Sequence, residues 1–174
     1  MSVVTTYLEQ TAPADLRPAR TPGPAPRIEL VGERSPEFNR FLYTTVGADW
    51  RWTDRLPWWV EEWDAWLAVP GRETWVMWVS GAPAGYVELD PRPGADGSHV
   101  EIAYFGLLPR FFGRGLGGHL LATVTGHAWR LAERWPRFAP VSRVWVHTCT
   151  LDGPYALANY HARGFRTVRV EETE

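Results

Sequence analysis

Apolar residues follow two different spacings along this chain, and the spacings divide it into strands and helices. Runs rich in β-branched and aromatic residues predict strands over residues 3–8, 27–31, 74–80, 84–89, 99–107, 143–148 and 165–170. Apolar residues three or four positions apart predict one helix that begins near residue 35 and three others over residues 56–67, 116–135 and 154–163. The order of these elements favours an α/β fold with one mixed sheet.

Two of the predicted helices have recognisable starts or faces. Ser35 followed by Pro36 is typical of a helix N-cap and first helical position. The residues expected on the buried face of this first helix are Phe38, Phe41 and Leu42. The residues expected to share one face of the second helix are Trp59, Trp63 and Trp66.

The chain is expected to fold as one domain preceded by an arm. Residues 11–26 contain five prolines without helical or strand periodicity, which is typical of an extended segment. We therefore expect residues 1–26 to form an N-terminal strand and a proline-rich arm packed on the domain, and residues 27–174 to form a single domain. No internal repeat is evident.

The charge and composition narrow the class of partner. Hydrophobic residues make up 45% and charged residues 22% of the 174 residues, as in ordinary globular proteins, and the formal charge is −2. Nothing in this balance favours nucleic acid or an anionic membrane. There is no signal-peptide pattern and no apolar run of roughly 18 residues, so we expect a cytoplasmic protein.

Missing residue types exclude several chemistries. The single cysteine, Cys149, rules out an internal disulfide and a cysteine-based zinc site, and we expect no metal. All 18 basic residues are arginines, so Schiff-base catalysis and the lysine of a phosphate-binding loop are absent. Of the 11 tryptophans, six fall within residues 50–66, where they could form core or the wall of a cleft.

The most informative segment is a glycine-rich turn between a predicted strand and a long predicted helix. Gly113, Gly115, Gly117 and Gly118 allow the backbone to bend and leave no side chain in front of a ligand. The first N–H groups of the helix are unpaired, and its dipole favours negative charge there. The turn therefore predicts a pyrophosphate site, to which Arg114 can add a charge-assisted hydrogen bond.

A dinucleotide cofactor is the first alternative to consider for this turn. Gly113, Gly115 and Gly118 satisfy the spacing G-x-G-x-x-G. That fingerprint also requires an acidic residue about 20 positions later, at the end of the next strand. The residue at that distance is Glu133, which lies within the predicted long helix. We therefore reject a nicotinamide cofactor.

Two motifs resemble those of the GNAT acyltransferase superfamily. Residues 112–117, Phe-Gly-Arg-Gly-Leu-Gly, resemble its motif A, [QR]-x-x-G-x-[GA], except that Phe112 replaces the glutamine or arginine. Residues 156–165 resemble its motif B, A-x-x-x-Y-x-x-x-G-F, although Gly153 stands where an asparagine is often found. The resemblance covers about residues 27–170. It implies a GNAT fold, a mixed and mostly antiparallel sheet flanked by helices, with splayed central strands.

The resemblance also implies acetyl-CoA as co-substrate. Backbone groups near Phe105, Leu107 and Leu108 are expected to pair with the pantetheine arm, and a strand N–H is expected to polarise the acetyl carbonyl. The residues expected around the pyrophosphate and the rest of the coenzyme are Phe112, Gly113, Arg114, Gly115, Leu116, Gly117, Gly118, His119 and Asn159.

Acetyl transfer by direct attack of an amine needs a base and an acid. Tyr160, at the motif B tyrosine position, is the candidate acid, and the alternative is a core tyrosine on a helix face. Glu101, 14 residues before Gly115 as in the histone-acetylating branch of the superfamily, is the candidate base. A solvent-facing strand carboxylate is the alternative for Glu101, and Glu88 is a weaker rival.

The acceptor is expected to be the primary amine of a small molecule that docks against the first two helices. The residues expected to line its pocket are Trp50, Trp52, Asp54, Trp59, His147 and Cys149. Aromatic faces beside carboxylates suit a cationic or aromatic amine. A covalent mechanism through Cys149 is disfavoured. A protein or peptide N-acetyltransferase and a non-catalytic coenzyme-binding module remain as alternatives, and related folds are often homodimers.

Overall fold

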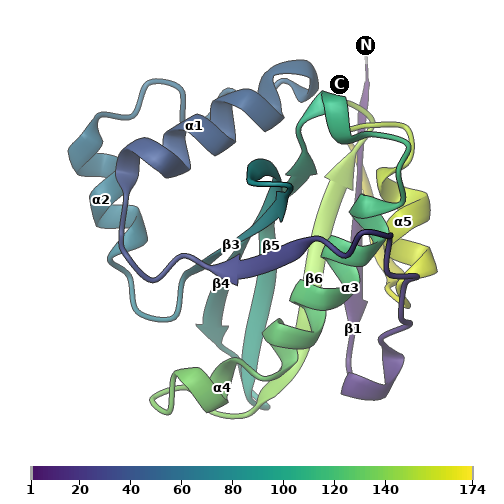
Figure 1. Ribbon diagram of the computed structural model, residues 1–174. Coiled ribbons are helices and arrows are strands. Elements are labelled where there is room, and N and C mark those ends of the chain that lie inside the picture. The colour runs from purple at the N-terminus through teal and green to yellow at the C-terminus, as the bar shows by residue number, and fades with distance from the viewer. Residues whose placement is uncertain (1, 174) are drawn as a thin grey trace.

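A computed structural model describes residues 2–173, and its centre is one seven-stranded sheet (Figure 1). The strand order is β2-β3-β4-β5-β6-β1-β7. All neighbouring strands are antiparallel except β5 and β6, which run parallel. The strands are β1 (Val3–Gln10), β2 (Arg27–Leu30), β3 (Glu73–Val79), β4 (Ala82–Pro93), β5 (Ser98–Leu107), β6 (Val141–Cys149) and β7 (Arg166–Thr173). The predicted mixed, mostly antiparallel sheet is confirmed.

Helices lie on both faces of the sheet (Figure 1). Their bounds are α1 (Pro36–Gly47), α2 (Val60–Leu67), α3 (Leu116–Trp129), α4 (Leu131–Arg134) and α5 (Ala156–Ala162). Along β4, Val87 belongs to the main core under α3, whereas its neighbour Tyr86 packs in a second core with Leu42 and Val46 of α1. Since adjacent strand residues point to opposite faces, α1 and α3 lie on opposite sides of the sheet.

The start of α1 is as predicted, but its buried face is not. The Ser35 hydroxyl accepts a hydrogen bond from the Phe38 amide at 3.3 Å, and Pro36 is the first helical residue. The expected apolar stripe is wrong at Phe41, which is 43% exposed. Tyr43, one position from Leu42, is buried instead, because its ring packs on Trp63 and Tyr104.

The second predicted helix starts four residues later than expected. It begins at Val60, and Trp59 is its N-cap, with the side chain of Glu62 accepting from the Trp59 amide at 2.7 Å. Only Trp63 is fully buried, Trp66 is half-buried, and Trp59 is 75% exposed, so the shared tryptophan face is wrong at Trp59. Trp59 has an extended backbone because it is the cap, so its side chain does not continue the face on which Trp63 and Trp66 lie.

The N-terminal strand is part of the sheet, between the last two strands of the domain. Tyr7 of β1 pairs with His147 of β6 on one side and with Arg169 of β7 on the other. The arm that follows crosses to α5, where the Arg17 amide donates to the Arg163 carbonyl at 3.0 Å. Gly164 has φ +92°, and a Cβ there would meet the Asp15 carbonyl oxygen, so only glycine fits this crossing.

Candidate active site

The two parallel strands at the centre of the sheet separate after a short paired segment. β5 and β6 pair only from Ser98 to Glu101 and from Val141 to Trp145, although β5 continues to Leu107 and β6 to Cys149. This divergence is the splay expected of the fold. Residues 103–108, in the middle of a sheet, are all half-exposed. An open strand edge of this kind is a template for an extended ligand that completes the ladder.

Backbone direction tells which residues of β5 face the splay. The Leu108 amide donates to the Ala84 carbonyl at 2.8 Å, and the Leu108 carbonyl accepts from the Phe111 amide at 2.9 Å. Because backbone groups alternate in direction along an antiparallel strand, those of Phe105 and Leu107 point away from β4, toward the splay. Of the three expected pantetheine contacts, the structure leaves Phe105 and Leu107 available, and both backbone groups of Leu108 are engaged.

A β-bulge lies where the splay begins. Glu88 of β4 faces Tyr104 and Leu89 faces Ile102, so Ala103 has no partner residue on β4. A bulge redirects the backbone groups next to it and increases the local twist. The β5 backbone around Ala103 therefore departs from the regular ladder with β4 at the point where the splay begins.

The glycine-rich turn has the geometry of an anion site. Gly113 and Gly115 both have φ +73°, Gly115 is the N-cap of α3, and a Cβ at Gly113 would meet nothing within 4 Å. Within residues 2–173, the amides of Gly113, Arg114 and Gly115 donate to no other backbone group. Leu116 is buried as a core residue, so it can offer only its amide. Burial lowers the pKa of His119, which leaves this imidazole neutral near pH 7.

Side chains from three segments surround the mouth of the splay. The Asn159 side chain from α5 lies over the first turn of α3. It is 3.5 Å from the point that a Cβ would occupy at Gly118 and 3.8 Å from the same point at Gly117. Trp50 packs against Phe112, with 6.2 Å between ring centroids, and against Gly153. Phe112 is therefore an aromatic wall where other motif A sequences have a polar side chain, and Trp50 spans from the turn after β5 to the loop after β6.

Tyr160 lies on one side of the splay. Its ring contacts Phe105 of β5 and Phe165, with 6.0 Å between centroids in each case. Burial, and secondarily the charge of Asp152, raises the pKa of Tyr160. Tyr160 therefore holds its proton throughout the neutral range, and burial makes it a weaker acid than a free tyrosine.

Glu101 and His147 meet on the opposite side of the sheet. Glu101 faces Trp145 across the paired segment, and its Oε1 lies 3.5 Å from Nδ1 of His147. This distance fits an ion-pair contact better than a full hydrogen bond. The Glu101 carboxylate raises the pKa of His147 although burial opposes it. The pair lies where β5 and β6 begin to separate, so a base on this face would reach the start of the splay.

The rival base Glu88 is already engaged. Its carboxylate, 3% exposed, accepts from Nη1 of Arg55 at 2.7 Å and 2.9 Å and from Nε1 of Trp66 at 2.9 Å. The Arg55 guanidinium, 4% exposed, is enclosed by aromatic rings whose centroids lie 4.1–5.9 Å from its central carbon. These rings belong to Tyr43, Trp58, Trp63, Trp66 and Tyr104. We call this group the Arg55 cage.

The remaining expected acceptor residues are not all brought together. Trp52 packs on Tyr104 of β5 at 4.8 Å between centroids, beside the splay. Cys149 ends β6, half-buried, two residues beyond His147 on the same face. Asp54 is exposed on the loop before α2, and Trp59 projects from the N-terminus of α2. The structure therefore brings Trp50, Trp52, His147 and Cys149 to the splay and leaves Asp54 and Trp59 at the surface.

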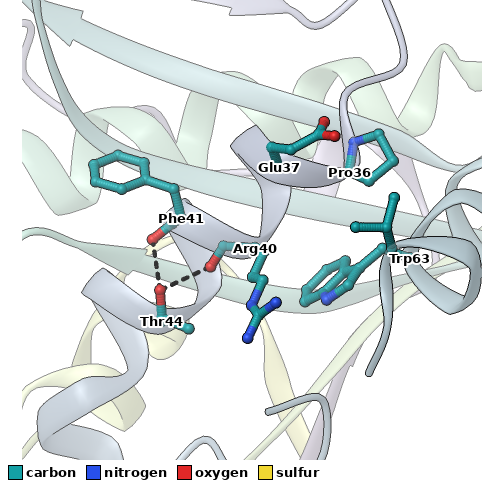
Figure 2. Close-up of a pocket in the computed structure, with 7 residues that line it drawn as sticks. Pro36, Glu37, Arg40, Phe41, Thr44 and Trp63 are labelled. Atoms are coloured by element: carbon teal, nitrogen blue, oxygen red, sulfur yellow. Dashed lines mark hydrogen bonds between the residues drawn. The ribbon is translucent and has the colours of Figure 1, made fainter. Parts of the chain in front are cut away.

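A hollow of about 300 Å³ lies elsewhere, between α1 and α2 (Figure 2). Figure 2 shows Glu37, Arg40 and Thr44 of α1 on one side and Trp63 of α2 on the other. The Thr44 hydroxyl shares its one proton between the backbone carbonyls of Arg40 and Phe41, so it is satisfied within the helix. None of the candidate catalytic residues borders this hollow.

Sequence reasoning missed the contact between Glu101 and His147 and the role of Arg55. The first joins residues far apart in the chain and depends on the parallel register of β5 and β6, which no local pattern reveals. For Arg55, the signal was present: one arginine within a cluster of tryptophans, with Glu88 on a predicted strand.

No group of three or more His, Cys, Asp or Glu side chains suited to a metal occurs among residues 2–173. In the same part of the chain, no helix has the length and apolarity to cross a membrane.

Comparison with known families agrees with this geometry. Residues 39–165 match the sequence profile of the acetyltransferase (GNAT) family. The chain therefore belongs to the GNAT family of acetyltransferases. Among curated proteins, no match was found.

Solved structures share the fold at low sequence identity. A GCN5-related N-acetyltransferase from Kribbella flavida superposes with a TM-score of 0.64 at 17% identity, over 94% of this chain and 54% of the other. A putative GNAT-family acetyltransferase from Novosphingobium aromaticivorans gives 0.59 at 18% identity, over 99% and 63%. The chain thus spans about half to two-thirds of these two proteins. An aminoglycoside acetyltransferase from an uncultured soil sample gives 0.62 at 16% identity, over 79% and 86%.

Proposed function

We propose that this chain transfers the acetyl group of acetyl-CoA to a primary amine of a small molecule. The observation that carries the proposal is the open edge of β5 between a glycine-rich helix N-terminus and two proton-transfer groups. Glu101 with His147 lies on the α1 face of the splay, and Tyr160 lies on the α3 face. A base on one face and an acid on the other suit an amine that enters from one side and a thiolate that leaves toward the other.

Each group has a defined part in the proposed reaction. Bound acetyl-CoA supplies the thioester, and the amides of residues 113–118 would bind its pyrophosphate. The amine nitrogen bonds to the carbonyl carbon and the carbon–sulfur bond breaks. Glu101, assisted by His147, takes the proton lost by the amine, and the Tyr160 hydroxyl protonates the departing sulfur. The β5 amides near Ala103 stabilise the negative charge on the carbonyl oxygen.

The contacts at the mouth of the splay support a small acceptor. Trp50, Phe112 and Gly153 narrow its mouth. Such a mouth favours a small amine over a peptide, which would need an open groove. A solved protein with the same fold is an aminoglycoside acetyltransferase, which supports an acceptor of small size.

The proposal is tested by release of the coenzyme thiol. We expect thiol release from acetyl-CoA that depends on an added amine, in a panel of arylalkylamines, polyamines and aminoglycosides. Acetylation of a peptide amine in preference to every small amine would overturn the choice of acceptor. Calorimetric binding of acetyl-CoA without thiol release from any amine or peptide would instead support a non-catalytic coenzyme-binding module.

Replacing Tyr160 with phenylalanine is expected to lower kcat by roughly ten- to a hundredfold, at or below the low end of general-acid effects. The loss is limited because a thiolate leaves more readily than an amine or alkoxide. Acetyl-CoA affinity should change little, since the ring and its contacts with Phe105 and Phe165 are retained. The measurements are steady-state kinetics and calorimetry. Tyr155→Phe, at an exposed tyrosine of the same segment, is the matched control. Equal kcat for Tyr160→Phe and wild type would remove the phenol from the mechanism.

A further inference from the structure

α3 packs on β6 from the main-core face of the sheet. On the opposite face α1 packs mainly on β4 and β5, and we call the part of this face over β6, β1 and β7 the open face. Tyr7, Trp145 and His147 share the open face, because Tyr7 is opposite His147 and Trp145 is two residues before it. Their rings form one continuous surface, with centroids 6.5 Å apart for Tyr7 and Trp145, 6.2 Å for Trp145 and His147, and 5.7 Å for Tyr7 and His147.

A hollow of about 350 Å³ lies on this surface. The residues that line it are Tyr7, Arg143, Trp145, Val168 and Arg169. Its volume is within the usual range for small-molecule sites. His147 does not line the hollow, but its ring adjoins both aromatic residues of the floor, so the hollow lies next to the proposed catalytic pair.

Both charged residues that line the hollow are arginines. The Arg143 guanidinium lies 5.2 Å from the centroid of Trp145, and that of Arg169 lies 3.9 Å from the centroid of Tyr7. Arg143 uses Nε to pair with Glu9, and Arg169 uses Nη1 to pair with Glu171 at 3.2 Å. A guanidinium has five N–H donors, so each pairing leaves donors for another acceptor. Two guanidinium groups over neighbouring rings suit an anion between them.

We infer that this hollow binds the far end of the acceptor, and that the acceptor is an amine carrying a carboxylate or phosphate on a flat or aromatic body. The inference rests on the proposed function and names its substrate class. The amine would lie at Glu101 and His147, the body over Trp145 and Tyr7, and the anionic group between Arg143 and Arg169. Arg169 and His147 are both opposite Tyr7, two strand spacings or roughly 10 Å apart. The amine and the anionic group are therefore separated by several bonds.

The same arrangement disfavours polycationic acceptors. An aminoglycoside or a polyamine would place positive charge against Arg143 and Arg169. We infer that this chain differs in acceptor from the aminoglycoside acetyltransferase that shares its fold.

The test compares two amines that differ only in the anionic group. Phenethylamine and 4-(2-aminoethyl)benzoate are titrated by calorimetry and assayed with acetyl-CoA. We expect the carboxylate compound to bind at least about tenfold more tightly, as one charge-assisted hydrogen bond would give. In Arg169→Gln, and separately in Arg143→Gln, this ratio should fall to about two or less. Arg137→Gln, at an exposed arginine that does not line the hollow, is the matched control and should keep the ratio.

The outcomes separate this inference from the proposed function. Acetylation of both amines with equal efficiency would overturn the anionic acceptor and leave the acetyltransferase activity standing. A tenfold preference in binding that is lost in Arg169→Gln, without thiol release from any amine, would support the anion site and overturn the proposed function. Equal binding of both compounds, together with self-association that Arg169→Glu abolishes, would assign the hollow to a second copy of the chain and overturn the inference.

Discussion

Replacing Glu101 with glutamine is expected to lower kcat/KM for amine acetylation on the order of 10²- to 10³-fold, while acetyl-CoA binds as before. The amide keeps the shape of the carboxylate but cannot accept the proton of the attacking amine. Glu101 lies on the opposite face of the sheet from the core that contains Phe105 and Tyr160, so the coenzyme contacts should be unaffected. The measurements are steady-state kinetics and coenzyme titration. Glu29→Gln, at an exposed strand glutamate, is the matched control.

The pH profile of the same variant tests the partnership with His147. The Glu101 carboxylate raises the pKa of His147, so in the wild type the imidazole stays protonated to a higher pH than a free histidine. If acetylation requires Glu101 and His147 both without a proton, the rate should therefore rise with pH through the raised pKa of His147. In Glu101→Gln the pKa of His147 should fall, and the residual activity should rise at lower pH. A loss of rate with an unshifted acidic limb would contradict coupling between the two residues.

Replacing Arg55 with methionine is expected to lower the free energy of unfolding by about 3–5 kcal/mol. The substitution leaves the Glu88 carboxylate, 3% exposed, with Trp66 Nε1 as its remaining side-chain donor. It also removes the cation around which the rings of the Arg55 cage are arranged. Urea denaturation, with the midpoint and slope compared with wild type, measures the effect.

A second substitution distinguishes a lost ion pair from lost packing. In Arg55→Met with Glu88→Met, no buried charge is left unpaired, so much of the stability should return. Arg34→Ala breaks an exposed ion pair with Asp64 and should change stability by less than about 1 kcal/mol. A double variant as unstable as Arg55→Met alone would show that packing of the guanidinium among the rings, rather than its charge, holds this region.

The local features of the site could be predicted because they depend on backbone chemistry close in sequence. Glycines at residues 113–118 and a following apolar spacing predict a bent turn into a helix, which the structure has at Gly115. Gly164 after a helical pattern predicts a helix end, and its positive φ agrees. The Ser35 cap is confirmed for the same reason. Each of these depends on residues within a few positions of one another.

The features that could not be predicted depend on contacts between distant segments. Whether Phe41 or Tyr43 faces the core depends on Trp63 and Tyr104, which belong to other elements. The exposure of Trp59 depends on where α2 begins, and element boundaries are the weakest part of a pattern-based reading. The pairing of Glu101 with His147 depends on strand register, which hydrophobic patterns do not fix across a parallel pair.

The position of β1 between β6 and β7 has a consequence for how the domain assembles. Tyr7 and His147, which are opposite one another, are separated by most of the chain, so their pairing closes a very long loop. Contacts of this kind form late and slow the folding of a domain, because the entropy of closure precedes the gain from pairing. β3, β4 and β5, joined by short turns, can form first. We therefore expect the strands that carry Tyr7, Trp145 and Arg169 to assemble last, so that the surface proposed to recognise the acceptor forms after the rest of the sheet.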